Sequence, residues 1–176
     1  NHYLSTFSRL MRNSLEYSRL DYISIYKEIN FIHAYLDIEK LRFEDRFEYS
    51  IDVSDEIPTH HYHIPPLLLQ PILENAIKHA FKDIPYQGQL EIRFLTAQRE
   101  DMIEVIINDN GAGLKEKQNE SNDSSHQSVG LSIIEDRIKM LNLDSETPKA
   151  SFRFFNRYDS NNELVGTQAH FVLPIQ

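Results

Sequence analysis

The sequence predicts an α/β protein in which helices and strands alternate, preceded by two further helices at the N-terminal end. Apolar residues recur at helical spacing in four segments, residues 3–19, 25–44, 67–81 and 129–142. Five other segments have the composition of strands, residues 46–53, 90–97, 102–109, 150–157 and 166–175. The chain is therefore expected to form a sheet packed against helices.

The composition fits one globular domain with an appendage. The chain has 176 residues, 40% of them hydrophobic, which is enough to bury a core. The net charge of −9 argues against nucleic-acid binding but permits a local basic pocket for a phosphate.

There are no cysteines, so disulfides and thiolate metal sites are ruled out. No apolar run could cross a bilayer, and the chain begins without Met, so we expect a fragment whose membrane anchor would lie upstream.

Local residues set the expected boundaries of the N-terminal elements. Ser24 is expected to cap the second helix, and the short connection before it predicts an antiparallel helix pair. Pro71 fits a helix only in its first turn, so the third helix is expected to begin near residues 67–69. Residues 55–66 contain three prolines and are expected to form a loop. Their HHYH run (60–63) could mimic a metal cluster, but without an acidic partner a solvent-exposed loop is the preferred interpretation.

The segment VIINDNGAGL, residues 105–114, allows two interpretations. Asn110 followed by Gly111 is a strong signal for a two-residue hairpin, whereas Asp109 followed by glycines suits the floor of a ligand pocket. A hairpin needs a second strand directly afterwards, but residues 115–128 contain no aliphatic or aromatic side chain. Long polar loops inside a compact domain are typically lids or disordered stretches. A hinged cover over a ligand is therefore the preferred prediction.

The positions of the glycines support the prediction of a lid. Gly111, Gly113 and Gly130 bracket the polar segment in a chain with only 5 glycines. This clustering indicates that the ends of the loop need unusual backbone conformations or close approach. The helix expected from Val129 would offer its unpaired N–H groups and positive dipole end to phosphate oxygens.

Four motifs occur in the order of the ATP-binding boxes of sensor histidine kinases: LQPILENAIKHA (69–80), NDNGAGL (108–114), VGL (129–131) and GTQAHFVLPI (166–175). From about residue 4 onward the chain resembles the C-terminal catalytic domain of these kinases, which has the Bergerat (GHKL) fold. The run IPPLLLQPILENAIKH, with YLDIEKLRF before it, resembles the LytS-like subfamily. The resemblance implies an α/β (α+β) two-layer sandwich, with helices on one face of a mixed β-sheet.

The resemblance also divides the chain. It implies that residues 1–44 are the end of the dimerisation and phosphotransfer helical region with its linker helix. Residues 45–176 would be the ATP-binding catalytic domain.

Individual residues take nucleotide roles from the same resemblance. Asp109 matches the aspartate that accepts a hydrogen bond from the adenine amine, and Thr167 matches the threonine that helps to hold adenine. Asn75 matches the asparagine whose amide oxygen ligates Mg²⁺. Lys78 and His79, on the same helical face, would reach the triphosphate. The motif glycines and leucines match the lid and its hinges: Gly111, Gly113, Leu114, Gly130 and Leu131.

Three departures from the family pattern bear on activity. Related ATPases activate water with a Glu four residues before the Mg²⁺ asparagine; Pro71 stands there, and Glu74 points elsewhere on the helix, so simple hydrolysis is disfavoured. The second glycine box reads SVGLSI (128–133) and lacks one glycine and an Asn, so lid closure and phosphate contacts are expected to differ. The phosphoacceptor His lies in a helix that this chain does not contain, and His2 lacks the surrounding motif.

The expected function is the ATP-binding catalytic portion of a two-component sensor histidine kinase that uses ATP and Mg²⁺. It would transfer the γ-phosphoryl group to a His outside this chain, and a response-regulator Asp would receive it next. The apolar stripe of the N-terminal helices would form a homodimer seam or pack on the domain. The resemblance implies a cytoplasmic domain of a membrane-anchored bacterial protein.

Alternatives of the same fold stay open. The altered second glycine box favours a pseudokinase that lacks ATP binding and acts as a dimeric interaction module. An anti-sigma-type serine kinase shares the fold, but the two N-terminal helices argue for the sensor architecture.

Overall fold

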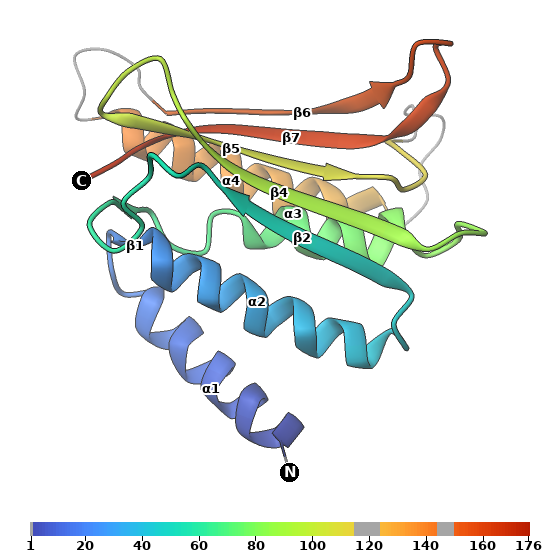
Figure 1. Ribbon diagram of the computed structural model, residues 1–176, viewed down its shortest axis with the longest axis horizontal. Helices are drawn as coiled ribbons and strands as arrows, with labels where there is room; N and C mark the ends of the chain where they lie inside the picture. The colour runs from blue at the N-terminus through green and yellow to red at the C-terminus, as the bar shows by residue number, and fades with distance from the viewer. Residues whose placement is uncertain (1, 115–123, 144–149) are drawn as a thin grey trace.

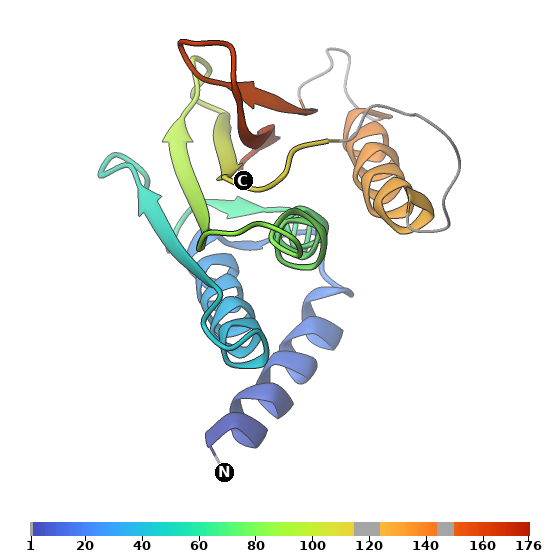
Figure 2. The same ribbon diagram turned by 90° about the vertical axis from the view of Figure 1, so that its right-hand side faces the viewer.

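A mixed β-sheet forms one layer of the molecule and helices form the other (Figures 1 and 2). The computed structural model describes residues 2–114, 124–143 and 150–176. Within these residues the sheet has five strands in the order β2-β4-β5-β7-β6. Strands β2 and β4 run parallel, and the other neighbours are antiparallel. The strands are β2 (Phe47–Val53), β4 (Gly88–Thr96), β5 (Met102–Asp109), β6 (Ser151–Tyr158) and β7 (Leu164–Pro174).

The helices cover a single face of this sheet (Figure 2). They are α1 (His2–Tyr17), α2 (Ile25–Arg42), α3 (Gln70–Asn75), the π-helical turn η1 (Ala76–Ala80) and α4 (Ser124–Leu143). This arrangement confirms the predicted two-layer sandwich with a mixed sheet and helices on one face. No helix in the described part of the chain is long and apolar enough to cross a membrane.

Helices α1 and α2 form the predicted antiparallel pair (Figure 1). The Ser24 hydroxyl caps α2 by accepting from the backbone N–H of Lys27 at 3.3 Å, as the sequence predicted. Leu36 of α2 is fully buried in the core shared with the sheet. Helix α1 is different, because it leaves a stripe of apolar side chains exposed: Leu4, Phe7, Met11 and Leu15.

Alternate residues of β5 and β7 face the core, and the last inner-face residue of each series is polar. In β5 the buried inner-face residues include Ile103, Val105 and Ile107, and the next inner-face position is Asp109. In β7, read backwards, the inner-face series runs through Phe171 to Thr167. Burying each large apolar side chain stabilises the fold by about 1.5–3 kcal/mol. Both strands therefore place a buried polar residue where the apolar layer stops.

Several elements differ from the sequence predictions. The predicted loop 55–66 contains β3 (His63–Ile64), which pairs antiparallel with β1 (Ile23–Ser24). The prolines flank this two-residue pairing and therefore do not prevent it. The third helix starts at Gln70 with Leu69 as its N-cap, close to the predicted start, but its second half is π-helical.

The predicted lid is only partly described. Residues 124–128, expected to be loop, belong to α4, which begins at Ser124 and not at Val129. Apolar periodicity cannot find a helical turn made of polar residues, so the start of α4 was predicted too late. Residues 115–123 of the predicted loop lie outside the described residues.

Candidate functional site

Asp109 is held by three donors at the end of β5. Its Oδ1 accepts from the backbone N–H groups of Gly111 at 2.8 Å and Thr167 at 3.2 Å. Its Oδ2 accepts from the Thr167 hydroxyl. An ionised carboxylate has about four lone-pair positions, so one position, on Oδ2, is left for a further donor. Asp109 and Thr167 are both buried, and the carboxylate therefore presents a fixed acceptor at the edge of the core.

Two glycines let the backbone close around this carboxylate. A Cβ added to Gly166, at φ +130°, would lie 1.9 Å from the carbonyl oxygen of Asp109. A Cβ on Gly111 would lie 2.4 Å from the Cβ of Ala80, at the end of η1. The backbone N–H of Ala112 donates to the Ala80 carbonyl at 3.1 Å. Glycine at 111 therefore lets the segment after β5 dock directly on η1, and the hairpin alternative is excluded because no strand follows among residues 110–114.

The side chain of Asn110 has a structural role, because it hydrogen-bonds to the backbone at the start of β4. Its side-chain Oδ1 accepts from the backbone N–H of Gln89 at 2.6 Å, and its Nδ2 donates to the carbonyl of Gln87 at 3.2 Å. The side chain thus ties the end of β5 to the start of β4. This is a structural reason for an Asn directly after Asp109.

Asn75 ends α3 on the side that faces the core. Its side chain is buried, and among the described residues its Nδ2 has no hydrogen-bond partner. An unpaired buried amide typically costs about 1–3 kcal/mol, which favours a position that a ligand completes. After Asn75 the helix widens, and the N–H of Phe81 donates to the carbonyl of Ala76, five residues back, at 3.0 Å.

Lys78 and His79 lie in this widened turn. The Lys78 ammonium pairs with a carboxylate oxygen of Glu74 at 3.4 Å and is half-exposed. The other oxygen of Glu74 accepts from the Gln70 side chain at 2.9 Å. His79 is half-buried. The α-helical spacing assumed for Asn75, Lys78 and His79 therefore stops at Asn75, because a π-helical turn follows.

The predicted lid residues lie at two places. Gly113, at φ +78°, and Leu114 close the described part of the segment after β5. Gly130 and Leu131 lie inside α4, so their N–H groups are not at the free helix end that was predicted. A Cβ on Gly130 would only meet Pro71 at 3.5 Å, an ordinary contact. In this structure α4 therefore packs on α3 without needing a glycine there.

Asn156 of β6 is a site residue that sequence reasoning missed. Its Oδ1 accepts from the backbone N–H of Leu114 at 2.6 Å, and its Nδ2 donates to the Leu114 carbonyl at 3.2 Å. In the sheet register it lies opposite Thr167. A polar residue at an inner-face position of β6 is a signal that could have pointed to it. Asn156 pins the point where the predicted lid leaves the sheet.

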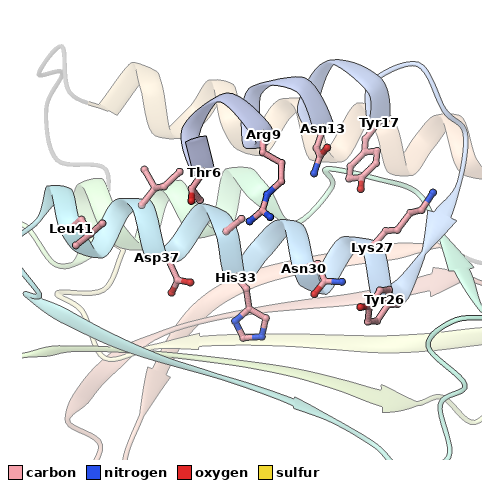
Figure 3. Close-up of a pocket in the computed structure, with 12 residues that line it drawn as sticks. Thr6, Arg9, Asn13, Tyr17, Tyr26, Lys27, Asn30, His33, Asp37 and Leu41 are labelled. Atoms are coloured by element: carbon pink, nitrogen blue, oxygen red, sulfur yellow. The ribbon is translucent and has the colours of Figure 1, made fainter. Parts of the chain in front are cut away.

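A groove of about 510 Å³ lies elsewhere, between α1 and α2 (Figure 3). Its polar lining includes Arg9, Lys27 and His33, and none of the predicted nucleotide residues takes part. The groove is open to solvent at an exposed helix pair. The polar positions that converge at Asp109 make the more specific candidate site.

Comparison with known proteins defines the class. The chain belongs to the family of histidine kinase-, DNA gyrase B-, and HSP90-like ATPases, whose model matches residues 65–176. Residues 1–47 match the histidine kinase model. The resemblance to sensor histidine kinases inferred from the four motifs is thereby confirmed.

Named relatives give the same result. The sensor histidine kinase YesM of Bacillus subtilis (strain 168) is 32% identical over 163 residues, covering 89% of this chain and 27% of YesM. The sensor protein LytS of Bacillus anthracis is 29% identical over 184 residues, covering 97% of this chain and 28% of LytS. The chain thus spans about a quarter of the length of these relatives.

Solved structures share the fold. The catalytic domain of histidine kinase ThkA matches with a TM-score of 0.56 at 12% identity, over 87% of this chain and 93% of that chain. ThkA in complex with the response regulator protein TrrA matches with a TM-score of 0.51 at 13% identity, over 97% of this chain and 48% of the other.

Proposed function

We propose that this chain is the ATP-binding catalytic portion of a two-component sensor histidine kinase, with adenine bound at Asp109. The observation that carries the proposal is the Asp109 carboxylate, which is buried, fixed by three donors and left with one free lone-pair position. Such an acceptor rewards the exocyclic amine of adenine and repels the carbonyl of guanine. Thr167 orients the carboxylate and adds its hydroxyl to the adenine side of the site.

The residues around Asn75 fit a magnesium-bound triphosphate. Mg²⁺ prefers oxygen ligands, and the Asn75 side chain supplies an amide oxygen from a buried position. When bound, the ion would neutralise phosphate charge. Lys78 would leave Glu74 to contact the phosphates, which is a small change because exposed ion pairs contribute only about 0–1 kcal/mol. His79 would join it from the next position of η1.

The lid would consist of the segment between β5 and α4. Gly111 and Gly113 would serve as its first hinge, Leu114 would be held by Asn156, and Gly130 and Leu131 would act from α4. In this proposal the first turns of α4 rearrange when a nucleotide is bound, because Gly130 and Leu131 now lie inside the helix, away from its N-terminal end.

The reaction would be phosphoryl transfer to a His outside this chain. The imidazole nitrogen would form a bond to the γ-phosphorus as the bond from that phosphorus to the bridging oxygen breaks and ADP leaves. The imidazole is already nucleophilic, so the protein would contribute positioning and charge neutralisation. Pro71 offers no base for water, which favours transfer over hydrolysis.

The partners follow from this role. A response regulator would accept the phosphoryl group on an Asp, and ThkA, which shares the fold, has been solved with such a partner. A second copy would pair through the exposed apolar stripe of α1 defined above. Residues 1–44 would form the helical region and residues 45–176 the catalytic domain.

A second candidate is a pseudokinase that serves as a dimeric interaction module. The packing of α4 on α3, together with the altered second glycine box, favours it. Calorimetry of ATP binding with and without Mg²⁺ distinguishes the two candidates. The kinase proposal expects Mg²⁺-dependent binding that Asn75→Ala abolishes, while Asn30→Ala, an exposed position of α2, leaves it unchanged. No binding at millimolar ATP would support the interaction module.

A further inference from the structure

One peptide group, between Pro66 and Leu67, is held from both sides by opposite charges. Its N–H donates to Oε2 of Glu28 at 3.3 Å. Its carbonyl accepts from Nη2 of Arg137 at 2.7 Å. Glu28 belongs to α2 and Arg137 to α4, so two helices far apart in the sequence meet at a single peptide.

The held peptide has a strained neighbour. Leu67 has φ +58°, a left-handed conformation that a bulky residue rarely adopts. The surroundings must therefore over-determine this conformation. Two residues later Leu69, the N-cap of α3, gives the helix no side-chain cap, so the path of the chain into α3 depends on the preceding contacts.

Glu28 is an unusual side chain for this task. It is 1% exposed and lies in the first turn of α2, near the positive end of the helix dipole. Burial raises the pKa of Glu28 to about 7, against the lowering effects of the Leu67 N–H and the Arg137 charge. Burial raises the pKa of the Tyr17 phenol in α1, and the charges of Glu16 and Glu28 raise it further. Burying an acid is costly unless it is hydrogen-bonded, and the Leu67 N–H supplies a hydrogen bond to Glu28 here.

The arrangement of the helices shows how a movement of α2 could reach α3 through the Pro66–Leu67 peptide. Helix α3 lies between α2 and α4 in the helical layer (Figures 1 and 2). Only Leu68 and Leu69 separate the held peptide from α3, which ends at Asn75. A shift of α2 along its axis would move Glu28 and release or tighten the Leu67 N–H.

We propose that Glu28 and Arg137 are positioning residues that lock the Pro66–Leu67 peptide and so couple the placement of α2 to α3, with Asn75, and to α4. The nucleotide readout of this coupling rests on the proposed function, whereas the mechanical coupling does not. Neither residue is among those assigned above to the nucleotide site. Both act through the peptide between them.

The test is a double-mutant cycle read by affinity for AMP-PNP with Mg²⁺ in the 176-residue chain. Glu28→Ala and Arg137→Ala should each raise the Kd about tenfold, and the double variant should also raise it about tenfold, since both changes release the same peptide. Glu28→Gln keeps an acceptor and should stay within about twofold of the parent. Leu36→Ala, a core truncation in α2, should lower stability without changing the Kd. Single variants that fold and bind like the parent, or effects that multiply in the double variant, would overturn the proposal.

Hydrogen exchange tests the coupling without nucleotide. In Arg137→Ala, a change at a half-buried residue of α4, amide exchange should accelerate in α3 and in the first turn of α2. Leu36→Ala should not reproduce that pattern. Faster exchange confined to α4 would contradict the coupling. If the parent does not bind AMP-PNP but the pattern is present, the proposed function fails and the coupling stands.

Discussion

Thr167 donates to the Asp109 carboxylate twice, through its backbone N–H at 3.2 Å and through its hydroxyl. The two residues lie opposite each other in the antiparallel pairing of β5 and β7. The register of β5 and β7 therefore places the two Thr167 donors within hydrogen-bond distance of the Asp109 carboxylate. Each strand contributes its polar residue at the same end of its inner face. The candidate site therefore lies on the inner face of the sheet, where the apolar residues of β5 and β7 end.

Thr167→Val tests the hydroxyl of this pair. The change keeps the side-chain shape but removes a donor from a buried carboxylate, which should lower the free energy of unfolding by about 1–3 kcal/mol. The affinity for ATP should fall about tenfold, because the carboxylate loses its orientation. Urea unfolding and calorimetry measure the two effects. Thr96→Val, at an exposed position of β4, should change neither, and equal losses in both variants would refute the assigned role.

Gly166→Ala should be strongly destabilising. The added Cβ would collide with the carbonyl of Asp109 and would stand at φ +130°, so the loss should exceed the ~1 kcal/mol typical of glycine replacements. Gly130→Ala is the comparison, since its Cβ would meet only Pro71 at 3.5 Å inside α4. It should stabilise the chain by about 0.5–1 kcal/mol in urea unfolding. Finding the two variants equally stable would show that the packing around β7 is not as described.

Glu28 should make stability depend on pH. Its pKa is raised from 4.5 to about 7 in the folded chain, so the folded state binds more protons than the unfolded state between these values. The contribution of Glu28 to the free energy of unfolding is fully present below pH 4.5 and is lost as the pH rises through about 7. Glu28→Gln should therefore gain stability relative to the parent across this window, by an amount on the order of 3 kcal/mol.

Urea unfolding of parent and Glu28→Gln at several pH values measures this difference. Titration of the 8 histidines is common to both chains and cancels in the comparison. Curves that run parallel from acid to neutral pH would show that Glu28 is not the titrating group.

Asn156→Ala should free the start of the lid. It removes the two hydrogen bonds that hold the backbone of Leu114. Exchange of the Leu114 amide should accelerate by at least about tenfold, which nuclear magnetic resonance can follow directly. Asn161→Ala, in the exposed turn between β6 and β7, is the control. An unchanged Leu114 amide would mean that other contacts hold this segment.

Periodicity and motif order predicted the strands and the fold, because a half-buried sheet imposes alternation and a core-facing helix imposes an apolar stripe. They also placed Asp109 and Thr167 in one site, and the register confirms that these two residues meet. What the motifs could not supply was contact between distant segments. Asn156 holding Leu114, and Glu28 meeting Arg137 at one peptide, are pairings that only the folded chain reveals.

Besides the short β3 pairing inside the predicted loop 55–66, two local predictions were wrong for physical reasons. The π-helical turn of η1 depends on tertiary contacts, such as Ala112 docking on Ala80, and not on local propensity. The first turns of α4 are polar, so the apolar pattern began only at Val129. The nucleotide roles of the site residues stay predictions.

The most direct test of the account is nucleotide selectivity at Asp109. Calorimetry would compare ATP with ITP, whose base has a carbonyl in place of the amine, on the parent, on Asp109→Asn and on Asp52→Asn as an exposed control on β2. The account predicts that the parent and Asp52→Asn bind ATP at least about tenfold more tightly than ITP, and that Asp109→Asn loses this preference. Equal affinity of the parent for ATP and ITP, or a preference that survives in Asp109→Asn, would contradict the claim that Asp109 reads adenine.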